Sequence, residues 1–189
     1  MPRLRVMKNV EEIIVARNQL YGAIRGFFAS RGYLEVETPI LVASPDMLPN
    51  LTPFETTIVG MDGSRRLGGL ITSPEFSMRK LLGLGLQKIF TITKVFRNGD
   101  FYPEGPSQHN PEFVMMEWYQ QGMDYKAGMD ETEALVKVCG LGNEPFARVH
   151  LPTRFKEVTE LELSDATESD LKSACEKLGL GTDPSDTWS

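Results

Sequence analysis

The residue types best suited to chemistry gather in one stretch of the chain, residues 97–119. Residues 111–120 read Pro-Glu-Phe-Val-Met-Met-Glu-Trp-Tyr-Gln, a pattern that predicts a long strand. Because side chains alternate between the two faces of a strand, Phe113, Glu117 and Tyr119 share one face. A carboxylate inside a sheet needs a cationic partner or a ligand. For this strand taken alone, the alternative to a binding site is a sheet face that is exposed to solvent.

Arg97 follows the clearest predicted strand, residues 88–96, and begins a polar loop over 97–109. A guanidinium at a strand end suits bidentate binding of a phosphate or carboxylate, whereas a surface ion pair is the plainer alternative. We expect the two long strands to be antiparallel neighbours, so that Arg97, His109 and Phe113 surround one sheet surface. Together these residues predict a nucleotide site with room for a cationic small molecule.

Further elements must hold these strands in place, and hydrophobic spacing predicts them. Helices are expected over residues 12–31, from 73 to about 83–85, and over 124–138. Shorter strands are expected over 34–37, 54–59 and 65–71, and this mixture indicates an α+β fold. Asp62-Gly63 is predicted to supply the positive-φ positions of a hairpin turn. Ser73 is predicted to cap the second helix, with Pro74 at its first position.

The last part of the chain, residues 141–189, has a different character. A short helix is indicated around residues 155–158. Thr167 and Asp170 form a capping box ahead of another helix. We therefore divide the chain into a core at 1–140 and a helical, insertion-like segment at 141–189.

Composition limits the classes of function. The chain has 189 residues, with 20 Lys and Arg against 26 Asp and Glu, for a net charge of −6. The length fits one domain with its own core, and the charge argues against broad nucleic-acid binding. No apolar run approaches the ~20 residues that span a membrane, and no signal peptide is evident. Cys139 and Cys175 are far apart, as expected of reduced thiols in a cytoplasmic protein.

Three segments resemble motifs of the class II aminoacyl-tRNA synthetases, specifically of their lysyl subgroup. Residues 96–98 and 109–119 resemble motif 2, and residues 32–39 resemble motif 1. Residues 72–80, Thr-Ser-Pro-Glu-Phe-Ser-Met-Arg-Lys, resemble the amino-acid-binding segment. The matches are in family order over about residues 12–125.

Within this subgroup, residues 53–56 and 117–119 resemble the stand-alone ligases that attach lysine or β-lysine to elongation factor P. The resemblance implies an antiparallel sheet flanked by helices, with ATP and Mg²⁺ as cofactors. It also implies elongation factor P as the acceptor. tRNA is the alternative acceptor, because a lysyl-tRNA synthetase fragment would carry the same motifs.

The resemblance implies roles for individual residues. Arg97 matches the arginine that holds the α-phosphate, and Phe113 matches the aromatic residue that stacks on adenine. Other residues implied to hold ATP are Asn98, Asp100, His109 and Asn110. Residues implied to bind the substrate are Ser73, Glu75, Glu117 and Tyr119. Among these, Glu75 meets the α-amino group, while Glu117 and Tyr119 recognise the side-chain ammonium.

Two features depart from the family pattern. Where the family has Glu two residues after the motif 2 arginine, this chain has Gly99, followed by Asp100. Motif 3, with its γ-phosphate arginine, and the downstream Mg²⁺-binding carboxylates are not found in residues 1–189. We therefore expect a catalytic domain that is incomplete at its C-terminus and holds no metal ligand. A non-catalytic dimerising or nucleotide-binding paralogue is the alternative.

Motif 1 also bears on assembly. In the family this element forms the subunit interface, so the resemblance implies a homodimer. We expect Phe27 and Phe28, on the motif 1 helix, to contribute to that interface.

Overall fold

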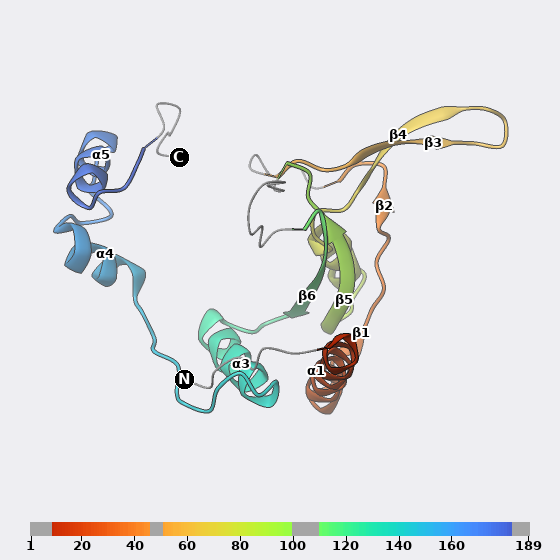
Figure 1. Ribbon diagram of the computed structural model, residues 1–189, viewed down its shortest axis with the longest axis horizontal. Helices are drawn as coiled ribbons and strands as arrows, with labels where there is room; N and C mark the ends of the chain where they lie inside the picture. The colour runs from red at the N-terminus through yellow and green to blue at the C-terminus, as the bar shows by residue number, and fades with distance from the viewer. Residues whose placement is uncertain (1–8, 46–50, 100–109, 183–189) are drawn as a thin grey trace. The chain divides into compact units, whose positions relative to one another are not determined.

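The computed structural model describes residues 9–45, 51–99 and 110–182. The chain forms two compact units, residues 1–143 and 144–189. Helices and sheets are mixed along the first unit, and the described part of the second is helical (Figure 1). The predicted α+β class is therefore confirmed.

The first unit contains two three-stranded sheets. One sheet has the order β1-β5-β6 and consists of β1 (Leu34–Glu35), β5 (Lys88–Phe96) and β6 (Glu112–Gln120). The other has the order β2-β4-β3 and consists of β2 (Leu41–Val42), β4 (Arg65–Leu70) and β3 (Glu55–Val59). β1 runs parallel to β5, and every other pairing is antiparallel. Both long strands form as the sequence predicts.

The helices also follow the predicted pattern closely. Those of the first unit are α1 (Val10–Ser30), α2 (Glu75–Gly83) and α3 (Tyr125–Val138). Those of the second unit are α4 (Leu151–Thr159) and α5 (Glu168–Lys177). Asp124 caps α3 as predicted, and the capping box of Thr167 and Asp170 is present on α5. None of the described helices combines the length and apolar character needed to cross a membrane.

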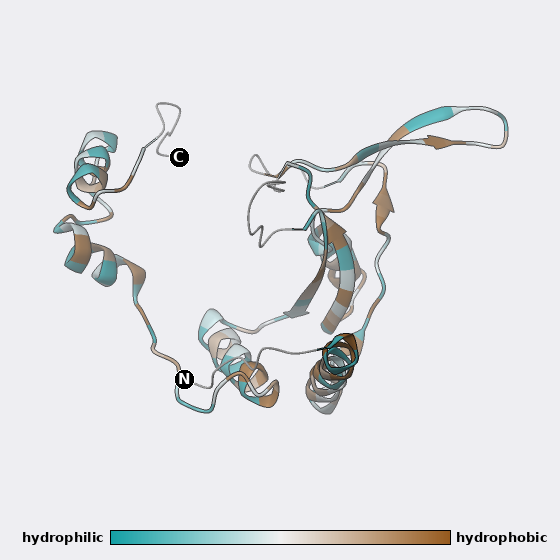
Figure 2. Ribbon diagram, viewed as in Figure 1, coloured by the Kyte–Doolittle hydropathy of each residue, from teal (hydrophilic) through white to brown (hydrophobic). Residues whose placement is uncertain are grey.

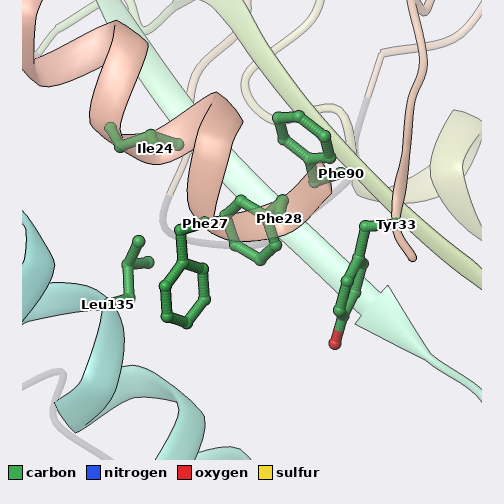
Figure 3. Close-up of a cluster of buried hydrophobic side chains, with 6 residues drawn as sticks. All are labelled: Ile24, Phe27, Phe28, Tyr33, Phe90 and Leu135. Carbon is green, nitrogen blue, oxygen red and sulfur yellow. The ribbon is translucent and has the colours of Figure 1, made fainter. Parts of the chain in front are cut away.

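Phe28 lies at the centre of the hydrophobic core and is completely buried. Its ring stacks on Phe90, with the ring centroids 4.7 Å apart. Phe27 and Tyr33 meet the same ring edge-on at 5.2 and 5.0 Å. Figure 3 shows these side chains converging with Leu135 of α3. The core therefore joins α1, α3 and one face of the β5–β6 pair.

This core corrects one prediction. Phe27 and Phe28 were expected at a subunit interface, but their side chains are 3% and 0% exposed within their own chain. Aromatic rings this large release the most free energy when they pack inside, and here the face of the sheet receives them. A contact between two copies would have to use other residues of α1.

Glu131 anchors α3 to the sheet by hydrogen bonds in partly buried surroundings. Its carboxylate accepts from the Tyr33 hydroxyl at 2.6 Å and from the Trp118 indole N–H at 2.9 Å. The Tyr33 hydroxyl also lies 3.1 Å from an oxygen of Gln120. Burial and the charge of Glu131 raise the pKa of Tyr33 above its ordinary value, so this phenol stays protonated. Polar groups removed from water keep their hydrogen bonds in this way.

The β3–β4 hairpin differs slightly from its prediction. Gly63 has a φ of +78°, but Asp62 is not in the left-handed region. The Gly63 N–H donates to the Gly60 carbonyl, and the Gly60 N–H donates to the Ser64 carbonyl. This is a turn that closes with a single positive-φ glycine, so Asp62 needs no such conformation. The Asp62 carboxylate instead accepts from the Ser64 N–H at 3.0 Å.

The core makes a quantitative prediction about stability. Changing Phe28→Ala removes a fully buried ring, so we expect the free energy of unfolding to fall by about 3–5 kcal/mol. Urea denaturation followed by circular dichroism measures this change. Phe76→Ala is the matched control, because Phe76 is 52% exposed and its loss should cost less than about 0.5 kcal/mol. Equal losses for the two variants would contradict the assigned core.

Candidate active site

The register of β5 and β6 places the predicted site residues on one face. Phe113 lies opposite Val95, Glu117 opposite Thr91, and Tyr119 opposite Ile89. The side chains of positions 113, 117 and 119 therefore point to the same side, as the strand alternation predicted. Tertiary packing buries the other face against α1 and α3. The candidate site is thus the face of the pair that points away from the core.

Helix α2 covers part of this face, because it packs on β5. Met78 of α2 is completely buried, as are Ile89 and Val95 of β5. Thr72, just before the helix, is also completely buried. Helix α2 and strand β5 therefore pack tightly together on one side of the site, and β6 lies beside β5.

The start of α2 differs by one residue from the prediction. Pro74, not Ser73, occupies the N-cap position, and the helix begins at Glu75. Ser73 is 8% exposed, and its hydroxyl accepts from the Glu75 N–H at 3.3 Å. Pro74 has no side-chain oxygen to offer, so Ser73 supplies one from the position before it. This arrangement fixes Glu75 in the first turn, above the sheet.

One end of the site combines carboxylates with a phenol. The Tyr119 hydroxyl donates to the Glu117 carboxylate at 3.1 Å. Glu75 forms an ion pair with Arg79, one helical turn away, at 2.6 Å. Both residues of this pair lie close enough to Tyr119 to influence its proton. We call Glu75, Arg79, Glu117 and Tyr119 the carboxylate pocket. Its carboxylates are suited to holding an amine.

The charges of the carboxylate pocket change the pKa of Tyr119. Burial raises this pKa above the ordinary tyrosine value, and the charge and hydrogen bond of Glu117 raise it further. The charge of Glu75 acts in the same direction, while Arg79 opposes it. A phenolate would place a third negative charge among these groups, so the neutral phenol is favoured.

The other end of the site contains Arg97 and Phe113. The Arg97 guanidinium carbon lies 5.3 Å from the centre of the Phe113 ring, and its Nε donates to the Thr72 carbonyl at 3.5 Å. Among the residues that the structure describes, Arg97 has no acidic partner. A partly buried guanidinium whose contacts in the described part of the chain are a ring and a carbonyl is suited to binding an external anion.

The remaining predicted nucleotide residues have different positions. Asn98 is exposed, and its backbone N–H donates to the Thr52 carbonyl at 2.8 Å. Asn110 lines a groove of about 590 Å³ between α1 and the sheet, together with Phe113 and Glu112. The structure therefore brings Phe113 to Arg97 but brings neither asparagine side chain into a described contact with them. Asp100 and His109 lie outside the described residues.

Comparison with known proteins relates this geometry to a family. Residues 3–182 match the family model described as tRNA synthetases class II (D, K and N). The chain belongs to this family of class II tRNA synthetases. The match includes both strands of the site, α2 and residues 144–182 of the second unit.

Several curated relatives of this class II synthetase chain share the name elongation factor P–(R)-β-lysine ligase. The Vibrio parahaemolyticus protein is 38% identical over 170 residues, which are 87% of this chain and 50% of that protein. The Pectobacterium carotovorum protein is 37% identical over 171 residues, 89% of this chain and 50% of the relative. The Salmonella paratyphi B protein is 35% identical over 168 residues. This chain spans about half the length of these relatives.

The class II synthetase family uses ATP and a divalent metal, so the site can be tested for both. Arg97 and Phe113 fit a nucleotide, because they place a guanidinium beside an aromatic ring on one face. ATP would supply the adenylyl group at this place. For a metal ion, the described residues contain no group of three or more His, Cys, Asp or Glu side chains that could hold one.

Sequence reasoning on this class II synthetase chain missed two residues. Thr72 contributes the carbonyl that Arg97 approaches, which is a backbone contact that no side-chain pattern reveals. Arg79 is the ion-pair partner of Glu75. The spacing of Glu75 and Arg79 could have indicated this pair, since residues four apart on a helix are neighbours.

The carboxylate pocket makes a prediction about titration. Changing Glu117→Gln removes a negative charge and a charged hydrogen-bond acceptor, so we expect the pKa of Tyr119 to fall toward its ordinary value. Ultraviolet titration of tyrosinate, taken as a difference from the Tyr119→Phe protein, measures this pKa. Glu112→Gln is the control, because Glu112 pairs with Lys94. An equal fall of the Tyr119 pKa in that variant would contradict the role assigned to Glu117 in the carboxylate pocket.

The raised pKa of Tyr119 also fixes the direction of a pH effect on stability. The folded protein holds this proton more tightly than the unfolded chain does. The resulting stabilisation is complete below the ordinary tyrosine pKa and is lost as the pH rises through the raised value. The same alkaline loss should be smaller in the Glu117→Gln protein.

Proposed function

We propose that this protein activates lysine or β-lysine with ATP, as an adenylate, and transfers it to a lysine of elongation factor P. The observation that carries this proposal is the pairing, on one sheet face, of an anion-binding end at Arg97 with the carboxylate pocket. The relatives support it, since their shared name states that acceptor and (R)-β-lysine. Because the acceptor is a translation factor, we expect the protein to act in the cytoplasm.

The proposed reaction needs two bond exchanges. A carboxylate oxygen of the amino acid attacks the α-phosphorus, and pyrophosphate leaves. The acceptor amine then attacks the acyl carbon, and AMP leaves. Neither step needs a covalent protein nucleophile, so the protein contributes by positioning groups and by offsetting charge.

Each end of the site has a task in this reaction. Arg97 offsets the negative charge that develops around the α-phosphorus, and Phe113 provides an aromatic surface for the base. Glu75 receives the amino group near the reacting carboxylate, and Glu117 with Tyr119 receives the side-chain ammonium. A carboxylate in a partly dehydrated pocket rejects a neutral side chain, because the negative charge of the carboxylate would then be left unpaired.

A lysyl-tRNA synthetase activity is the second candidate, because the family model is that of the tRNA synthetases. The two candidates share the activation step and differ in the acceptor. Purified elongation factor P and lysine tRNA, offered separately with labelled lysine or β-lysine, distinguish them. Label on the protein supports our proposal, and label on the tRNA alone overturns it.

The activation step gives a direct test of Arg97. We expect lysine-dependent exchange between ATP and pyrophosphate, and its loss by at least about 100-fold in Arg97→Ala, because transition-state charge would be unbalanced. Arg66→Ala is the control, since Arg66 is exposed on the β3–β4 hairpin. The assay uses the complete gene product that carries these residues. Exchange absent from that unchanged product would favour a non-catalytic paralogue.

We also propose that two copies associate through α1. Several large apolar side chains of this helix are exposed: Val10, Ile13, Ile14, Val15 and Leu20. Figure 2 shows α1 with apolar as well as polar positions along its length. Burying such side chains against a second copy would remove them from water.

This proposal predicts the outcome of one substitution. Ile14 is 54% exposed, so Ile14→Lys should leave the fold intact and yield a monomer, because a buried unpaired ammonium opposes association. Sedimentation velocity measures the change in mass, and circular dichroism confirms folding. Arg17→Lys, a charge-preserving change on the same helix, is the control. A monomeric unchanged protein, or a dimer that survives Ile14→Lys, would contradict the proposal.

A further inference from the structure

The ion pair between Glu75 and Arg79 has a consequence for ligand choice, and it rests on the proposed function. The two side chains meet at 2.6 Å on α2, and the charges of both act on the pKa of Tyr119. Arg79 keeps 63% of its side-chain surface exposed, whereas Glu75 keeps 35%. The carboxylate is thus the more buried partner of the pair.

Arg79 changes the charge that a ligand meets in the carboxylate pocket. Glu75 and Glu117 act together on Tyr119, and Arg79 acts against them. These four side chains are therefore close enough to share one electrostatic environment. A ligand amine that enters this environment meets the carboxylates of Glu75 and Glu117, and the charge of Glu75 is offset by Arg79.

We propose that Arg79 is a specificity-determining residue that sets the charge of the carboxylate pocket. With Arg79 present, the pocket favours an amino acid that carries two ammonium groups and one carboxylate, over a diamine that carries the two ammonium groups alone. The extra positive charge of the diamine is repelled by the guanidinium. The carboxylate of the amino acid offsets that repulsion.

The structure separates this role from an ordinary helix-surface pair. Another four-residue pair, Lys137 with Glu133, lies on α3, which packs on the opposite face of the sheet. Glu75 differs because its backbone N–H is held by the buried Ser73 hydroxyl, so the residue is fixed at the start of α2. Arg79 therefore acts on a carboxylate whose position is set independently of the pair.

Isothermal titration calorimetry at low ionic strength tests the proposal with two ligands, L-lysine and 1,5-diaminopentane. Diaminopentane is lysine without its carboxylate. In Arg79→Gln we expect the ratio of the two dissociation constants to shift toward the diamine by about two- to fivefold, the range of an exposed charge pair. Added salt should shrink this shift, because screening shortens the reach of the charges.

Two further variants give the test its control. Arg79→Lys keeps the charge and should keep the ratio of the unchanged protein. Arg66→Gln removes one positive charge from an exposed position on the β3–β4 hairpin. The ratio should therefore stay unchanged in that variant. An unchanged ratio in Arg79→Gln, or an equal shift in Arg66→Gln, would overturn the role of Arg79.

The same measurement keeps this inference distinct from the proposed function. If the unchanged protein binds neither L-lysine nor β-lysine, the proposed function fails and the inference fails with it. If lysine binds but the ratio of the two dissociation constants is the same in Arg79→Gln as in the unchanged protein, the proposed function stands and the inference alone is overturned.

Discussion

The full-length antiparallel pairing of β5 with β6 is the interaction on which the rest of the structure depends. It runs without a break from Lys88 opposite Gln120 to Phe96 opposite Glu112. Side chains alternate along a strand, so a shift of β6 by one residue would exchange its two faces. Glu117 would then enter the apolar core, and Trp118 would leave it. One register therefore defines both the core and the candidate site.

The two faces of this pair fix the register together. On the core side, the Phe28 ring packs on both Phe90 and Trp118, at centroid distances of 4.7 and 5.6 Å. Glu131 adds a polar constraint, because it accepts hydrogen bonds from Tyr33 and Trp118. A slipped strand would bury a charge and leave these polar groups unpaired, and both costs are large compared with net stability.

The site face is rigid for a related reason. Helix α2 buries Met78 against β5, so the first turn of the helix is held at a fixed place above the sheet. Glu75 and Arg79 thereby influence the pKa of Tyr119, although 44 and 40 positions separate them from it along the chain. At the other end, Arg97 leaves β5 beside Phe113 on the neighbouring strand. Groups that bind and offset charge are effective when the scaffold positions them before the ligand arrives.

The sequence alone determined the local features, because short-range chemistry specifies them. Alternation placed Phe113, Glu117 and Tyr119 on one face, the Thr167 capping box began α5, and the family motifs indicated a class II synthetase. Several features required the tertiary structure. The resemblance to motif 1 suggested an interface at Phe27 and Phe28, but their helical stripe fits an internal core equally well, and only the packing of β5 and α3 decides between the two. The approach of Arg97 to the Thr72 carbonyl and the position of Glu75 and Arg79 beside Tyr119 join segments far apart in the chain. Such contacts depend on how α2 packs on the sheet, and no pattern within a single segment contains that information.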